Sequence, residues 1–149
     1  MHTIVHNIET TLVAAPQTVQ AAAINSGNID TQGTETLAVI VMVGTIGETL
    51  DSENRLDLKI EHADDDGTGA PAGYSACTDD DVQNASDLSS GIFAVIDHAD
   101  KTQKRHMVEY TGGKRFVKVT ATPVSLATGG PVAMLALAGN AAQKPVSNT

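Results

Sequence analysis

One stretch of this 149-residue chain constrains the fold more than any other, because it alternates apolar and charged residues without a break. In residues 55–62, RLDLKIEH, the leucines and the isoleucine fall on one side of an extended chain and the acids and the lysine on the other. An antiparallel strand with one face in a core and one face in solvent produces this pattern. The stretch therefore predicts a half-buried strand, and His62 at its end shares the inward side.

A second stretch has the opposite character. Residues 36–44, TLAVIVMVG, are almost continuously apolar and rich in β-branched side chains. Such a run is typical of a strand that is covered on both faces. We expect these residues to form a central strand in the middle of the core.

Five further stretches carry strand signals and are separated by turns rich in glycine, asparagine and proline. They are residues 18–25, 92–97, 106–111, 114–122 and 132–138. Because Gly112 and Gly113 can adopt the positive φ of a two-residue hairpin turn, we expect residues 106–111 to pair with residues 114–122.

Helical signals are weak. Residues 78–88 form the one mild candidate, a short turn capped by Thr78 or Asp79. Residues 133–142 are rich in alanine, but the Gly-Gly-Pro before them and the Gly-Asn after them favour a closing strand. With seven short strands and no long amphipathic segment, the chain is predicted to be all-β. We predict an antiparallel β-sandwich of the jelly-roll type.

The domain boundaries follow from the same reading. Residues 18–139 are expected to form the β-sandwich domain, residues 1–17 an N-terminal arm and residues 140–149 a polar C-terminal tail. Terminal segments of this composition are ordered mainly when they dock on something else.

Charge and hydropathy exclude two classes of partner. The net charge of −9 repels phosphate backbones, so we expect no binding to nucleic acid. The longest apolar run, residues 37–43, is far shorter than the roughly 20 residues of a membrane-spanning helix, so we expect no membrane span. Polar residues interrupt residues 1–16 where a signal peptide would be apolar, which indicates assembly in the cytoplasm.

No arrangement in the sequence predicts catalysis, a cofactor or a metal. Cys77 is the one cysteine and has no histidine near it in sequence, so it is interpreted as an incidental thiol. The acidic residues 64–66 lack the spacing of an EF-hand loop, which favours a solvated turn over a calcium site. For His62 a hydrogen bond at the strand end is favoured over a role as a metal ligand.

Three of the nine basic residues lie close together in the stretch YTGGKRFVKVTATP. In strand phase Lys118 faces outward and Val117 and Val119 face inward. Lys114, Arg115 and Lys118 have two interpretations: cations that offset nearby carboxylates, which is favoured, or a contact site.

Three stretches together resemble a known family: LDLKIEHADDDGTG, CTDDDV and YTGGKRFVKVTATPVSLATGGPVAMLALAG. They are similar to small capsid decoration (cement) proteins encoded beside the major capsid protein of tailed bacteriophages, over residues 36–139. The resemblance implies a structural virion protein on the capsid exterior that bridges neighbouring major capsid subunits, with possible self-association as a trimer. It would use arm and basic residues as its interface: Ile4, Val5, Leu12, Val13, Lys114, Arg115 and Lys118.

Two alternatives stay open. Genes of this kind also encode tail or head-to-tail completion proteins. The order of EHADDDG and a later KRFVKV is also similar to discoidin-type, galactose-binding jelly rolls. Against sugar binding, Tyr74 lies at a distance from the acidic turn and the chain has no tryptophan.

Overall fold

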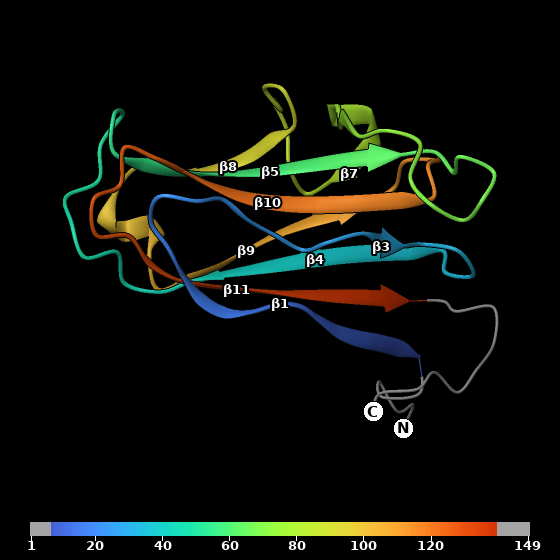
Figure 1. The fold of residues 1–149 in the computed structure, drawn as a ribbon, viewed down its shortest axis with the longest axis horizontal. Coiled ribbons are helices and arrows are strands. Elements are labelled where there is room, and N and C mark those ends of the chain that lie inside the picture. Colours follow the sequence, from blue (N-terminus) through green and yellow to red (C-terminus); the bar gives the residue numbers. More distant parts are fainter. Residues whose placement is uncertain (1–6, 140–149) are drawn as a thin grey trace.

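The computed structural model describes residues 7–139, which form two antiparallel sheets packed face to face (Figure 1). Its strands are β1 (Ile8–Val19), β2 (Ile24–Asn25), β3 (Ile29–Asp30), β4 (Thr36–Val43), β5 (Arg55–Ala63), β6 (Ser75–Ala76), β7 (Val82–Gln83), β8 (Ile92–Ile96), β9 (Lys104–Tyr110), β10 (Phe116–Val124) and β11 (Gly130–Gly139). Two short 3-10 helices, η2 (Asp79–Asp81) and η3 (Ala99–Lys101), join them. The predicted all-β antiparallel sandwich is confirmed, and the arrangement is consistent with a jelly roll.

The five-stranded sheet has the order β1-β11-β4-β9-β7. The six-stranded sheet has the order β2-β10-β5-β6, with β3 also paired to β10 and β8 to β5. Between the two sheets lies the core, where Val39 and Val41 of β4 and Leu58 and Ile60 of β5 are fully buried. Aliphatic side chains fill this layer, as the scarcity of aromatic residues requires.

The alternating stretch forms β5 and behaves as predicted. Its apolar residues are completely buried, while Lys59 and Glu61 point outward and are bonded to each other at 2.9 Å. Asp57 is buried despite its outward phase, because its carboxylate accepts hydrogen bonds from the Arg55 guanidinium. On the neighbouring β10, Val117 and Val119 face inward and Lys118 outward, as expected.

The prediction for residues 36–44 is correct about the central position of the strand and wrong about its cover on both faces. β4 is central, between β11 and β9, but it is covered on one face. Val39 and Val41 are buried against the six-stranded sheet, whereas Ile40 is half-buried and Met42 is 42% exposed. Within residues 7–139 the sandwich has two layers, so the outward side of β4 has no third layer to cover it.

The predicted hairpin is also wrong. β9 pairs with β4 in the five-stranded sheet and β10 pairs with β5 in the other, so the intervening glycines carry the chain across the sandwich. Neither glycine adopts a positive φ. Instead the hydroxyl of Tyr110 accepts a hydrogen bond from the Lys114 N–H at 3.0 Å. A Cβ at Gly112 would lie 2.6 Å from that hydroxyl, so glycine is needed here for close approach.

The boundary predicted at residue 17 falls inside β1. Residues 8–17 are part of this edge strand, which pairs along its length with β11 and has irregular register around Ala14. Pro16 is tolerated because β1 is at the sheet edge. Ile4, Val5 and the tail at residues 140–149 lie outside the described residues.

Two weaker predictions have different outcomes. As far as residue 139, where the described residues end, the alanine-rich stretch belongs to strand β11, as predicted. The helix candidate at residues 78–88 contains one 3-10 turn, η2, and then continues into β7.

Candidate functional site

A row of apolar side chains crosses the outer side of the five-stranded sheet. Leu12 of β1 is the register partner of Leu135, which pairs with Ile40, which in turn pairs with Met107 of β9. All four residues fall on the side of the sheet opposite the buried valines of β4. The row therefore spans four neighbouring strands without a charged residue.

Two more side chains widen this row. Met42 follows Ile40 on the same side of β4, and Leu137 follows Leu135 on the same side of β11. We call the set the apolar face: Leu12, Ile40, Met42, Met107, Leu135 and Leu137. Leu12 is 58% exposed, Met42 42% and Met107 39%, and the other three are half-buried.

The apolar face is contiguous across four strands, and charged residues bound it on β9. Its six outward positions, each about 4.8 Å by 6.8 Å, cover roughly 200 Å². Arg105 and Glu109 lie on either side of Met107 on the same side of β9, since they pair with Met42 and Ala38. A hollow at one end of the face has a mixed lining, in which Met107 and Leu137 lie beside Glu109 and Thr36.

The opposite surface of the sandwich is polar. The outward positions of β5 and β10 pair Lys118 with Glu61, Thr120 with Lys59 and Thr122 with Asp57. The two outer surfaces therefore differ sharply, although the same core supports both.

The structure distributes the residues predicted for an interface. Leu12 lies on the apolar face, whereas Val13 packs against the core cluster. Sequence reasoning missed Ile40, Met42, Met107, Leu135 and Leu137. The signal that could have found them was the unbroken apolar run of β4, which implies a cover on both sides.

The three predicted cations are paired with carboxylates of the chain itself. Arg115 binds Asp30 through two nitrogens, at 3.0 and 2.7 Å, and also contacts Asp65. The hydrogen bonds from Arg115 lower the pKa of Asp30, and those with Asp30 raise the pKa of Arg115. These contacts agree with the interpretation of Arg115 as a cation that offsets nearby acids.

Lys118 and Lys114 are engaged in a similar way. The Lys118 ammonium lies 3.3 Å from Glu61 and 4.1 Å from the centre of the Tyr74 ring, so it covers one face of that ring. Lys114 contacts Asp64 at 3.5 Å and the Ser75 hydroxyl at 3.2 Å. The Tyr74 hydroxyl itself donates to Asn28.

Two of the three carboxylates of the acidic turn at residues 64–66 also form hydrogen bonds within the turn. Asp65 accepts hydrogen bonds from the N–H groups of Gly67 and Gly69, and Asp66 accepts from Thr68 and Ala70. Those hydrogen bonds lower the pKa of both carboxyls. The two side chains therefore stabilise their own loop.

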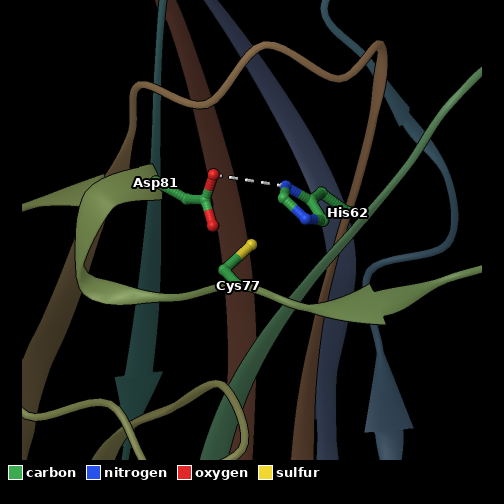
Figure 2. A group of neighbouring side chains, drawn as sticks. All are labelled: His62, Cys77 and Asp81. Atoms are coloured by element: carbon green, nitrogen blue, oxygen red, sulfur yellow. Dashed lines mark ion pairs between the residues drawn. The ribbon is translucent and has the colours of Figure 1, made fainter.

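A buried polar cluster lies at the far end of β5, and the sequence reasoning did not find it. His62 and Cys77 are buried and Asp81 is half-buried; each offers one ligand atom, and the three atoms lie within 4.8 Å of one another (Figure 2). Strand pairing brings them together, because His62 is the register partner of Ser75, two residues before the cysteine. Cys77 has no histidine near it in sequence, but the fold places one beside it.

His62 is hydrogen-bonded in this cluster, and burial shifts the pKa of both His62 and Cys77. The Nδ1 atom of His62 lies 3.1 Å from the Tyr110 hydroxyl and 3.8 Å from Asp81 Oδ1, so the predicted hydrogen bond of His62 is confirmed. Burial lowers the pKa of His62, with the Asp81 carboxylate opposing the shift. Burial also raises the pKa of the Cys77 thiol to about 12. A thiol in this state is not an activated nucleophile.

None of the helices within residues 7–139 has the length and apolar character needed to cross a membrane. No protein family matches the chain, and no curated protein is similar to it.

Among solved structures, the chain is similar to the disulfide-linked pili of Bacillus endospore appendages, with 15% identity, a TM-score of 0.38, and coverage of 90% of this chain and 89% of that one. It is also similar to the VP2 subviral particle of infectious bursal disease virus, with 14% identity, a TM-score of 0.28, and coverage of 96% of this chain and 41% of that one. The Gt strain of the same virus gives 12% identity, a TM-score of 0.25, and coverage of 89% and 36%. The chain thus spans less than half the length of these viral proteins, and similarity this low identifies no function.

Proposed function

We propose that this protein is a structural, non-enzymatic virion component that decorates a phage-type capsid and stabilises it by bridging neighbouring major capsid subunits. The observation that carries the proposal is the apolar face, which a chain with a net charge of −9 leaves uncovered on a central strand. The resemblance of residues 36–139 to decoration proteins supplies the partner.

The energetics favour attachment through the apolar face. Removing apolar area from water contributes about 25 cal/mol per Å². About 200 Å² per partner is a quarter of the area of a standard interface, so one copy alone would bind weakly. A shell presents many equivalent sites, and a copy that touches two subunits at once gains avidity from the second contact.

The polar outer side of the six-stranded sheet fits the same arrangement. With the apolar face against the shell, Lys59, Glu61 and Lys118 would face solvent and keep the particle surface hydrophilic. Because Arg115 and Lys118 already bind carboxylates of the chain, we assign the main contact to the apolar face instead of the basic residues.

Stoichiometry in purified particles tests this proposal. Particles of the phage or prophage that encodes the chain would be purified, and the ratio of this protein to the major capsid protein measured by quantitative mass spectrometry. Decoration predicts a ratio close to a simple fraction of the major capsid protein, and loss of capsid heat resistance when the gene is deleted. A few copies per particle, with capsids of unchanged stability, would assign the protein to the tail or connector instead.

A further inference from the structure

The buried cluster of His62, Cys77 and Asp81 has the composition of a zinc site. Zinc in proteins is bound by imidazole nitrogen, thiolate sulfur and carboxylate oxygen, and this mixture disfavours the hard cations calcium and magnesium. The three residues come from separate elements: the end of β5, the residue after β6, and the last residue of η2. Figure 2 shows the three side chains pointing toward one another.

The distances between the ligand atoms are somewhat longer than those around a tetrahedral ion. With zinc bonds of about 2.0 to 2.3 Å, neighbouring ligand atoms lie about 3.3 to 3.6 Å apart. His62 Nδ1 and Asp81 Oδ1 are 3.8 Å apart, and all three ligand atoms lie within 4.8 Å. An inward movement of about 1 Å or less would complete three bonds to the ion.

The surrounding hydrogen bonds already orient the carboxylate. Asp81 Oδ2 accepts from the N–H and the hydroxyl of Thr78, at 2.8 and 2.9 Å, which leaves Oδ1 directed at His62. Supporting contacts of this kind are a regular feature of metal sites.

The Tyr110 hydroxyl, now on His62 Nδ1, has an alternative acceptor. The Lys114 carbonyl lies 3.4 Å away from it. A metal ion on Nδ1 would therefore not leave this buried hydroxyl without a hydrogen-bond acceptor.

The electrostatics of the cluster also favour a cation. The His62 imidazole and the Asp81 carboxylate face each other at 3.8 Å, with the Cys77 sulfur beside them. The nearby Lys114 ammonium does not bond to these atoms, because it contacts Asp64 and Ser75. A divalent ion at this point could bond to all three side chains at once, after the Cys77 thiol loses its proton.

We propose that His62, Cys77 and Asp81 bind one Zn²⁺ per chain and that this ion ties the two sheets together at one end of the sandwich. His62 belongs to the six-stranded sheet, whereas Asp81 immediately precedes β7, which pairs with β9 of the five-stranded sheet. A single cysteine allows no disulfide within the chain, so a metal staple would supply a covalent-like link that the sequence otherwise lacks. The side chain of Asp81 is 21% exposed, which gives water access to the fourth position.

Binding has a defined proton balance. The ligands must be a thiolate, a neutral imidazole and a carboxylate, so the Cys77 thiol loses its proton to solvent while the other two residues are already in the required form near pH 7. Formation of the site therefore releases about one proton per zinc ion.

Cobalt and zinc titrations of the full chain test the proposal. Co²⁺ added to the reduced protein should give a thiolate-to-cobalt charge-transfer band that saturates at one ion per chain and is displaced by Zn²⁺. Zn²⁺ at 100 times its dissociation constant should shift the folding equilibrium about 100-fold and raise the melting temperature. Calcium and magnesium should have no such effect.

Substitutions localise the signal. Cys77→Ser should abolish the charge-transfer band, and Asp81→Asn, at a partly exposed position, should weaken zinc binding while the chain still folds. A matched control is His98→Gln, since His98 and Asp100 form an exposed pair at 3.3 Å. A second control replaces both His2 and His6 by glutamine.

The outcomes are distinct. Loss of the band and of the thermal shift in the Cys77 and Asp81 variants, with both controls unchanged, supports the site. Absence of the band in the native chain would overturn the proposal, as would zinc binding that survives Cys77→Ser and Asp81→Asn but disappears in a histidine control. Circular dichroism is used to check that each variant is folded before its metal-binding result is interpreted.

Discussion

Replacing the three most exposed side chains of the apolar face should abolish docking while the domain stays folded. The change is Leu12→Thr, Met42→Thr and Met107→Thr, which keeps a residue suited to strands at each position. Full burial of a leucine or methionine contributes about 1.5 to 3 kcal/mol. The fractions that remain exposed are 58%, 42% and 39%, so burying them in an interface is worth about 2 to 4 kcal/mol together.

That free energy corresponds to roughly 30- to 1,000-fold weaker binding per site. The assay is co-sedimentation of the purified protein with capsids that lack it, over a range of concentrations. A control variant carries Lys59→Ala, Thr120→Ala and Thr122→Ala on the opposite, polar surface, and should bind like the native chain. If the apolar-face variant melts cooperatively and still binds with native affinity, the assignment of this face is refuted.

Two further predictions concern the fold. Gly129→Ala should destabilise the domain by about 3 kcal/mol or more in urea denaturation, since Gly129 has a φ of +69° and an added Cβ would collide with the Val19 carbonyl oxygen. Gly113→Ala, with ordinary φ and open space, should change stability by less than about 0.5 kcal/mol, and equal effects of the two would contradict the turn geometry described for Gly129. Burial holds the pKa of His62 below 6.5, so in the presence of a chelator the unfolded chain gains a proton first, and stability should fall as the pH drops from about 6.5 toward the lower folded-state pKa. His62→Gln should flatten that part of the profile, and an unchanged slope would assign it to another group.

Local patterns in the sequence predicted what local physics determines. The period-2 alternation of β5 indicated its inward residues correctly, because a strand in a two-layer sandwich has one buried face and one face exposed to solvent. The same reasoning predicted the wrong environment for the outer face of β4. A continuous apolar run indicates that both faces are covered, but it does not distinguish a cover within the chain from one supplied by a partner.

Long-range pairing was the part that the sequence did not determine. A Gly-Gly pair is compatible with a tight hairpin and also with a connection from one sheet to the other. Here the chain crosses between the sheets, and a hydrogen bond from the Lys114 N–H to the Tyr110 hydroxyl stabilises this connection. Likewise, the neighbourhood of Cys77 depends on the register of β5 against β6, which places His62 opposite Ser75. A correct register for that pair would have placed His62 near Cys77.

Methionine oxidation tests the central claim most directly, because the chain has its own reporters. Met42 and Met107 lie on the apolar face at 42% and 39% exposure, whereas Met134 is fully buried in the core and serves as an internal reference. Free protein and purified particles would be treated with peroxide, and oxidation at each position followed by mass spectrometry. The account predicts that Met42 and Met107 are oxidised in the free chain and protected in the particle, while Met134 is protected in both. Equal oxidation of Met42 and Met107 in the two states would show that the apolar face stays open on assembly and would contradict the account.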